Sequence, residues 1–115
     1  MKVGFIGMGV MGEPMARHIL EAGHDLLACD ARQESCQALI AKSAGYTASA
    51  GEAAAECEAV ILCVPYPGPQ KIVVDEVLAN AKPGLLIIDT TVMPPTINEE
   101  LEQTCKAQAL EYIDA

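Results

Sequence analysis

Apolar runs and helical patterns alternate along the whole chain. Continuous apolar runs predict six strands, at about residues 1–6, 25–29, 46–48, 59–64, 85–88 and 110–113. Apolar residues at helical spacing predict five helices between them, at about residues 12–22, 31–42, 50–56, 72–82 and 97–105. Unbroken apolar runs are typical of parallel strands covered on both faces, and strand–helix–strand crossovers are right-handed. The pattern therefore predicts an α/β fold, a doubly wound parallel sheet of about six strands in three αβα layers.

Two of the predicted helices begin with capping-box residues. Ser49 stands three positions before Glu52, and Thr96 stands three positions before Glu99. In a capping box the hydroxyl and the carboxylate satisfy main-chain N–H groups that the first helical turn leaves free. The third and fifth helices are therefore predicted to begin at these residues.

The turn between the first strand and the first helix is rich in glycine. It reads Gly7-Met8-Gly9-Val10-Met11-Gly12. Gly7 permits a tight turn, Gly9 lets the main chain approach a pyrophosphate, and Gly12 lets the helix pack closely on the strand. The free N–H groups of the helix start then face the phosphates. This context predicts a nucleotide site of the Rossmann type, although the same pattern also serves S-adenosylmethionine.

Asp30 ends the second predicted strand. A carboxylate at this place accepts hydrogen bonds from the 2′- and 3′-hydroxyls of a ribose and repels a 2′-phosphate, which favours NAD over NADP. Arg32 follows closely and can accommodate that phosphate, so NADP stays open. Asp30 can also cap the helix predicted to begin near Ala31, and the two roles are compatible.

The loops after the fourth and fifth strands contribute further residues to the same edge of the sheet. They contain Val64-Pro65 and Thr90-Thr91. Taken alone, Val64-Pro65 is equally typical of a strand terminator, and Thr91 of a hydroxyl bonded to its own turn. Ligands of doubly wound sheets bind beyond the carboxyl ends of the strands. Their shared place with the glycine turn and Asp30 therefore favours contact with a ligand.

Composition narrows the class of partner. The chain has 115 residues, enough for one domain, and 16 acidic against 7 basic residues give a net charge of −9. This charge argues against nucleic acid and anionic membrane as partners and favours a small molecule. Five cysteines at irregular spacing fit neither a disulfide framework nor a metal site, so reduced thiols are expected. With no leader and no membrane-spanning run in the sequence, a cytoplasmic location is expected.

Several segments together are more specific than the glycine turn alone. They are residues 3–16, Gly23-His24, Asp30, Val60 to Pro65, Ile87 to Asp89, and Asp114-Ala115. In these segments the chain resembles, from end to end, the amino-terminal part of the β-hydroxyacid dehydrogenases. This superfamily contains the 3-hydroxyisobutyrate and 6-phosphogluconate dehydrogenases, which transfer hydride between a nicotinamide cofactor and a 2- or 3-hydroxyacid.

The resemblance implies a role for each candidate residue. Gly7 to Gly12 would hold the pyrophosphate, Asp30 the adenosine ribose, Val64 and Pro65 the neighbourhood of the nicotinamide-side ribose, and Thr91 the nicotinamide. The sequence departs from the family pattern at Val92, where a further threonine is usual, and at Ala109, near which a glycine is usual. The missing hydroxyl at position 92 bears on the nicotinamide contact, whereas the change near Ala109 bears on the geometry of its loop rather than on chemistry.

Family members continue beyond the region of resemblance. They carry a substrate-binding segment, a helix with a catalytic lysine, and a helical second domain. Four lysines lie in predicted helices or loops away from the matching region and are predicted to be solvated: Lys42, Lys71, Lys82 and Lys106. Residues 1–115 are therefore expected to form a truncated dinucleotide-binding domain that binds NAD or NADP without turnover. A hydroxyacid substrate would be used only if the missing portion were supplied.

Two other functions are compatible with the same turn. A stand-alone NAD-sensing regulatory module needs no catalytic lysine, and a methyltransferase would use the turn and Asp30 for S-adenosylmethionine. The Glu13-Pro14-Met15-Ala16 and Asp89-Thr90-Thr91 segments favour the dehydrogenase. A final strand at the sheet edge also predicts a homodimer, because edge strands offer unpaired main-chain groups.

Overall fold

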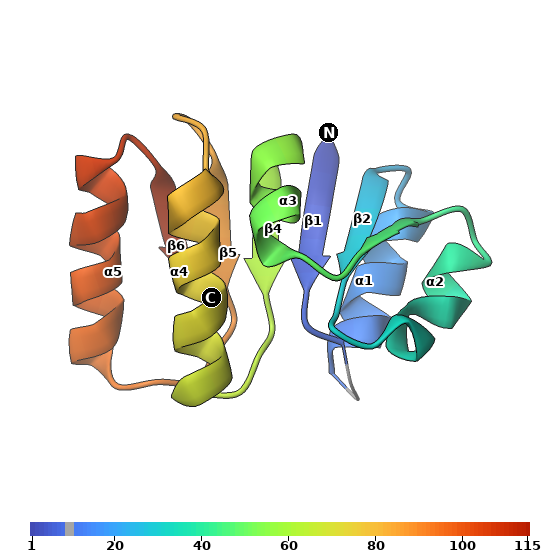
Figure 1. Cartoon of the computed structure of the whole chain (residues 1–115), viewed down its shortest axis with the longest axis horizontal. Helices are drawn as coiled ribbons and strands as arrows, with labels where there is room; N and C mark the ends of the chain where they lie inside the picture. Colours follow the sequence, from blue (N-terminus) through green and yellow to red (C-terminus); the bar gives the residue numbers. More distant parts are fainter. Residues whose placement is uncertain (9–10) are drawn as a thin grey trace.

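The structure is a computed structural model that describes residues 1–8 and 11–115. The predicted site residues Gly9 and Val10 lie outside the described residues. Six parallel strands form one sheet in the order β3-β2-β1-β4-β5-β6 (Figure 1). The order reverses beside β1, which is the arrangement of a Rossmann-like fold, so the predicted fold class is confirmed.

The strands lie close to their predicted places. They are β1 (Lys2–Ile6), β2 (Asp25–Cys29), β3 (Gly45–Thr47), β4 (Ala59–Leu62), β5 (Leu86–Asp89) and β6 (Glu111–Asp114). The fourth strand ends at Leu62, so Cys63 and Val64 belong to the loop that follows it. This places Val64 in the loop at the carboxyl edge of the sheet.

The helices follow the predicted order. They are α1 (Gly12–Glu21), α2 (Gln37–Ile40), α3 (Ala50–Glu56), α4 (Gly68–Asn80) and α5 (Pro95–Ala107). The helix predicted over residues 31–42 is shorter than expected, because a 3₁₀ turn, η1 (Gln33–Cys36), precedes a single turn of α2. Asp30 therefore stands before a turn of the chain and not at the cap of a long helix.

Of the two predicted capping boxes, the one at α3 is formed in its Ser49 half only, and the one at α5 is not formed. The Ser49 side chain accepts the N–H of Glu52 at 3.1 Å, as predicted for α3. The main-chain N–H of Ser49 itself donates to Thr47 Oγ1 at 3.0 Å. At α5 the N-cap is Pro94 and the helix begins at Pro95, so Thr96 lies inside the first turn. A proline at the first helical position has a suitable φ and no N–H to satisfy, which moves the start before Thr96.

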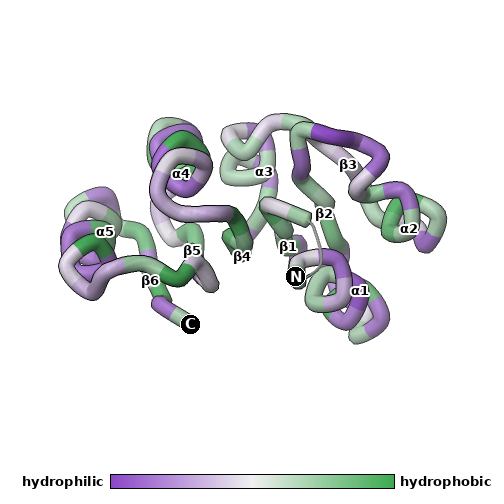
Figure 2. Tube along the Cα trace, turned by 90° about the horizontal axis from the view of Figure 1, so that it is seen from below, coloured by the Kyte–Doolittle hydropathy of each residue, from purple (hydrophilic) through white to green (hydrophobic). Residues whose placement is uncertain are grey.

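The helices cover the two faces of the sheet unequally. Helices α3, α4 and α5 lie along one face, whereas α1 lies on the other (Figure 2). Leu39 of α2 packs with Phe5 and Ala28 in the core under α1. The larger core lies under α3, α4 and α5 and contains Val60 and Leu62.

The strand register shows where the second face is open. Phe5, Ile61, Ile88 and Ile113 are register partners across β1, β4, β5 and β6. Phe5 is fully buried, Ile61 and Ile88 are half-buried, and Ile113 at the sheet edge is 48% exposed. The described helices on this face therefore cover the sheet over β1 and β2 and leave it open toward β6.

The carboxyl ends of the parallel strands meet at one edge of the sheet. The turn after β1, Asp30 after β2, the loop after β4 and the loop after β5 all lie there. Among the described residues, none of the helices has both the length and the apolar character to cross a membrane.

Candidate functional site

The glycine turn is packed against the end of β4. Gly7 has φ +96°, a conformation that glycine adopts without strain. A Cβ at Gly7 would overlap the Cys63 carbonyl and come within 2.7 Å of Val64 Cγ1. A Cβ at Gly12 would overlap the Gly7 carbonyl and reach the Phe5 ring. The roles predicted for Gly7 and Gly12, a tight turn and close helix packing, match this geometry.

The Asp30 carboxylate is hydrogen-bonded to the glycine turn. Asp30 Oδ2 accepts the main-chain N–H of Met8 at 2.9 Å, and Oδ1 accepts that of Arg32 at 2.9 Å. The main chain of Asp30 is held as well, because its carbonyl accepts the Tyr46 hydroxyl at 2.8 Å and its N–H donates to Thr47 O at 3.3 Å. Asp30 therefore lies directly beside the turn with its orientation fixed.

A cavity of about 290 Å³ opens at this place. Gly7, Asp30 and Val64, three of the predicted residues, line it together. Ala48 and Ile72 also line it, and the sequence analysis did not identify them. Ile72 is 63% exposed, and its place at this cavity follows from the packing of α4, which the sequence pattern does not report.

The other described candidates do not line this cavity: Met8, Met11, Gly12, Pro65 and Thr91. Met11 precedes α1 with its side chain 71% exposed. Pro65 is exposed, and its carbonyl accepts the N–H of Gln70 at 3.0 Å at the start of α4. Pro65 therefore shapes the entry into α4, whereas β4 already ends at Leu62, three residues before it.

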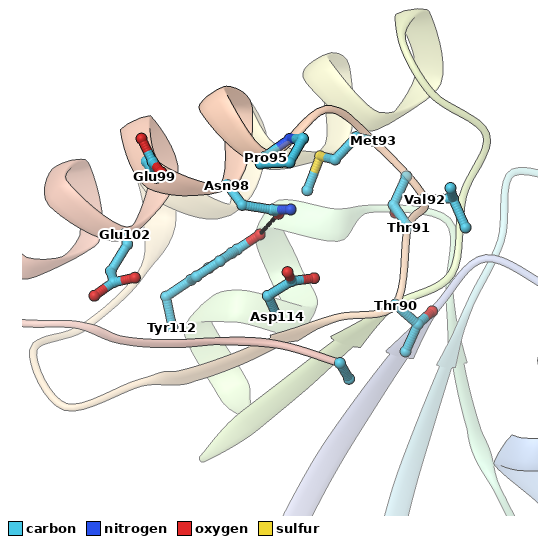
Figure 3. A pocket seen from close by; sticks show the side chains of 11 residues that line it. Thr90, Thr91, Val92, Met93, Pro95, Asn98, Glu99, Glu102, Tyr112 and Asp114 are labelled. Carbon is cyan, nitrogen blue, oxygen red and sulfur yellow. Dashed lines mark hydrogen bonds between the residues drawn. The ribbon is translucent and has the colours of Figure 1, made fainter.

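The loop after β5 forms the wall of a second cavity, of about 480 Å³ (Figure 3). Thr90 is tied to β4, because its N–H and its hydroxyl both donate to Leu62 O, at 2.9 and 2.7 Å. Thr91 is buried, with 7% of its surface exposed, and its hydroxyl oxygen has no hydrogen-bond partner among the described residues. Buried hydroxyls are nearly always paired, so an unpaired one calls for a partner that the described residues do not supply.

The cysteines do not form a reactive centre. All five are free, four of them buried and Cys63 half-buried. Burial raises the pKa of Cys29 to about 12 and the pKa values of Cys36 and Cys57 to about 11. These three thiols therefore remain protonated near neutral pH and act as small apolar side chains, as predicted for Cys29.

Comparison with known proteins assigns the fold to a family. The family described as the NAD binding domain of 6-phosphogluconate dehydrogenase matches residues 2–115. An uncharacterized oxidoreductase of Bacillus subtilis, YkwC, is 33% identical over 98% of this chain and 40% of its own length. The mitochondrial 3-hydroxyisobutyrate dehydrogenase of Drosophila melanogaster is 31% identical over 98% of this chain and 35% of its own length.

Solved structures agree with this assignment. The 3-hydroxyisobutyrate dehydrogenase of Mycobacterium tuberculosis, whose structure includes L-serine, superimposes with a TM-score of 0.88 at 28% identity. The match covers 96% of this chain and 38% of that one. The chain thus spans about two fifths of the length of these relatives. On the match over residues 2–115, the chain belongs to the family of NAD-binding domains of 6-phosphogluconate dehydrogenase.

Proposed function

We propose that this chain binds a nicotinamide dinucleotide, NAD or NADP, as the cofactor portion of a hydroxyacid oxidoreductase. The main support for this proposal is the hydrogen bond between Met8 N–H and the Asp30 carboxylate at 2.9 Å. This bond connects the glycine turn, which is suited to a diphosphate, with a carboxylate that is suited to a ribose. The two parts of one nucleotide therefore have adjacent partners.

The glycine turn fits a pyrophosphate. Gly7 and Gly12 leave no room for a side chain between the turn, the end of β4 and the start of α1. Met11 at the N-cap of α1 makes no side-chain cap, so the first N–H groups of the helix are not satisfied by that residue. Main-chain N–H groups at a helix start, with the positive end of the helix dipole, stabilise phosphate oxygens. Gly7, Met8, Gly9, Val10, Met11 and Gly12 would form this cradle.

Asp30 fits a ribose diol. Each carboxylate oxygen has two lone pairs, and each has one bond in the structure, to Met8 or to Arg32. Both oxygens can therefore accept a ribose hydroxyl while the present bonds persist. The negative charge of Asp30 disfavours a 2′-phosphate, so NAD is the preferred cofactor. Arg32 is exposed two residues further on and keeps NADP binding in reach.

The remaining candidates would hold the nicotinamide side. Val64 and Pro65 follow β4, and Thr91, with its unpaired hydroxyl, follows β5. When bound, the nicotinamide ring supplies a carbon that accepts or gives up a hydride. The chain's own residues would orient that ring and exclude water from one side of it.

Turnover is proposed to require residues beyond those in this sequence. The four candidate lysines, at positions 42, 71, 82 and 106, are all exposed, and Lys71 pairs with Asp75 at 3.4 Å. None of the four has the burial or the position at the nicotinamide side that a proton-transferring lysine needs. The names of the relatives, 3-hydroxyisobutyrate dehydrogenases among them, favour a 2- or 3-hydroxyacid as the substrate of the complete enzyme.

Calorimetric titration with NAD⁺, NADP⁺ and S-adenosylmethionine tests the proposal. We expect NAD⁺ to bind most tightly and S-adenosylmethionine not to compete with it. Asp30→Ala removes two acceptors for the ribose and is expected to weaken NAD⁺ by about tenfold or more. Asp25→Ala is the matched control, because Asp25 is exposed at the opposite end of the same strand. Unchanged NAD⁺ affinity in Asp30→Ala would show that the ribose assignment is wrong.

A further inference from the structure

Asp89 is a fully buried carboxylate at the end of β5 that the proposed function does not use. Its exposed fraction is 0%, and burial of a charged group is costly unless hydrogen bonds compensate it. Three groups surround it. The Thr91 N–H donates to Oδ1 at 2.9 Å, and on the Oδ2 side the Tyr112 hydroxyl lies at 3.3 Å and Gln70 Nε2 at 3.5 Å. The carboxylate thus joins the loop after β5 to α4 and β6.

The partners of Asp89 are themselves held in place. Gln70 is 3% exposed, and the Tyr112 hydroxyl also lies 3.0 Å from Asn98 Oδ1 of α5 (Figure 3). A tyrosine hydroxyl has one proton, so it donates to Asp89 or to Asn98 at any moment and not to both. Burial and the neighbouring Asp89 raise the pKa of Tyr112, so the hydroxyl stays a donor throughout the physiological range.

The network leaves one group of the loop unsatisfied. Thr90 uses its N–H and its hydroxyl on Leu62 O, and Thr91 uses its N–H on Asp89. The Thr91 hydroxyl is buried without a partner among the described residues, in a residue that lines the cavity after β5. The bond to Asp89 fixes the Thr91 main chain, and rotation about the Thr91 Cα–Cβ bond can then turn the hydroxyl toward the cavity that this residue lines.

We infer that Asp89 is a positioning residue for the cofactor: its buried carboxylate fixes the Thr91 main chain so that the Thr91 hydroxyl faces the nicotinamide half of the ligand. The inference rests on the proposed function. Asp89 does not touch the ligand itself. Its effect is confined to the nicotinamide half, whereas the turn and Asp30 serve the adenosine half.

The test compares NADH with ADP-ribose, which lacks the nicotinamide ring. Thr91→Val is expected to weaken NADH by about three- to tenfold, the worth of one hydrogen bond, with Thr91→Ser retaining the affinity. Asp89→Asn keeps an acceptor of the same shape but loses the charge, and about threefold weaker NADH binding is expected. Asp89→Ala is expected to match Thr91→Val. The affinity for ADP-ribose stays within about twofold in every variant.

A double variant separates positioning from a general structural role. Asp89→Ala combined with Thr91→Val is expected to bind NADH no more weakly than the weaker single variant, because both remove the same contact. If Asp89→Ala does not fold, Asp89→Asn combined with Thr91→Val answers the same question. Asp75→Asn, an exposed acid of α4, controls for the loss of one negative charge.

The outcomes distinguish the inference from the function beneath it. Additive losses, or equal weakening of NADH and ADP-ribose in the Asp89 variants, would overturn the positioning role while the proposed function stands. A wild-type chain that binds neither ligand would instead contradict the proposed function.

Discussion

At Gly7 two constraints coincide: a left-handed main chain and a neighbouring strand that leaves no space for a side chain. Gly7 and Gly23 have nearly the same φ, +96° and +97°, but a Cβ at Gly23 meets none of the described atoms within 4 Å. Gly23→Ala should therefore cost only the strain of the left-handed region, about 1 to 2 kcal/mol. Gly7→Ala should cost more than about 3 kcal/mol, because the turn must also move away from Cys63.

Urea unfolding of the two glycine variants measures this difference. Equal losses in the free energy of unfolding would show that the close packing of the turn on β4 contributes nothing. The comparison needs no ligand, so it tests the shape of the cradle independently of what the cradle binds.

Three buried thiols make stability sensitive to alkaline pH. Burial raises the pKa of Cys29 to about 12 and those of Cys36 and Cys57 to about 11, from 9.0. Above pH 9 the unfolded chain loses these protons while the folded chain keeps them. The contribution of these thiols to the free energy of unfolding is therefore constant below that pH and falls as pH rises, by at most about 1.4 kcal/mol per pH unit for each thiol.

Urea unfolding under reducing conditions, from pH 7.5 to about pH 10.5, checks the sign and the source of this slope. Cys29→Ala lowers stability at every pH but should give a shallower decline than the wild type. Parallel curves for the two proteins across the alkaline range would contradict the role of Cys29.

Among the elements, α3 and α5 begin by different devices. Ser49 caps α3 through its bond to Glu52 N–H at 3.1 Å, so Ser49→Ala is expected to cost about 1 kcal/mol. Thr96 lies within the first turn of α5, after Pro94 and Pro95, and Thr96→Ala should change stability by less than about 0.5 kcal/mol. Thermal or urea unfolding measures both. A larger loss for Thr96→Ala than for Ser49→Ala would restore the capping box that the sequence predicts.

The same elements show what could be predicted from the sequence. Apolar runs located the strands because the central parallel strands are buried, as Val60 and Leu62 show. The predicted start of α5 at Thr96 is wrong because Pro94 and Pro95 begin the helix one residue earlier than the Thr96 and Glu99 pattern indicates. Contacts between side chains far apart in the sequence could not be predicted. The bond between Asp89 and Tyr112, from neighbouring strands, exists only once β5 and β6 pair.

In the candidate site, too, some features could be predicted from the sequence and others depend on tertiary packing. The glycine turn and Asp30 were predicted because each residue type has a local reason to stand where it does. The lining by Ile72 and the unpaired hydroxyl of Thr91 depend on how α4 and the loop after β5 settle on the sheet. No periodicity in the sequence reports either feature.

At the scale of the whole molecule, the uneven covering of the sheet has a consequence for association. In the row Ile61, Ile88 and Ile113, the first two are half-buried and Ile113 on the edge strand β6 is exposed. An apolar face beside an unpaired strand edge favours association with a second copy of the chain, which is the basis for expecting a homodimer. The net charge of −9 opposes association of like molecules and is screened by salt.

We expect sedimentation equilibrium to show dimers that become more abundant with added salt. Ile113→Asp should weaken the dimer by more than about tenfold, because it places a charge in the apolar row of both copies. Val92→Asp is the matched control, since Val92 is 92% exposed but lies in the loop after β5, outside the row. Monomers at every salt concentration, or equal effects of the two variants, would contradict the prediction.

The central claim is that the carboxyl edge of the sheet holds a dinucleotide across the turn after β1, Asp30 and the loops after β4 and β5. The most direct measurement is the change in ¹H–¹⁵N amide signals when NAD⁺ is added to the labelled chain. We predict saturable shifts at the amides of Gly7, Met8, Asp30, Val64 and Thr91, whereas those of Asp25 and Gly84 at the opposite edge stay unchanged. Saturating NAD⁺ that leaves the amides of Gly7, Met8 and Asp30 unchanged would contradict it.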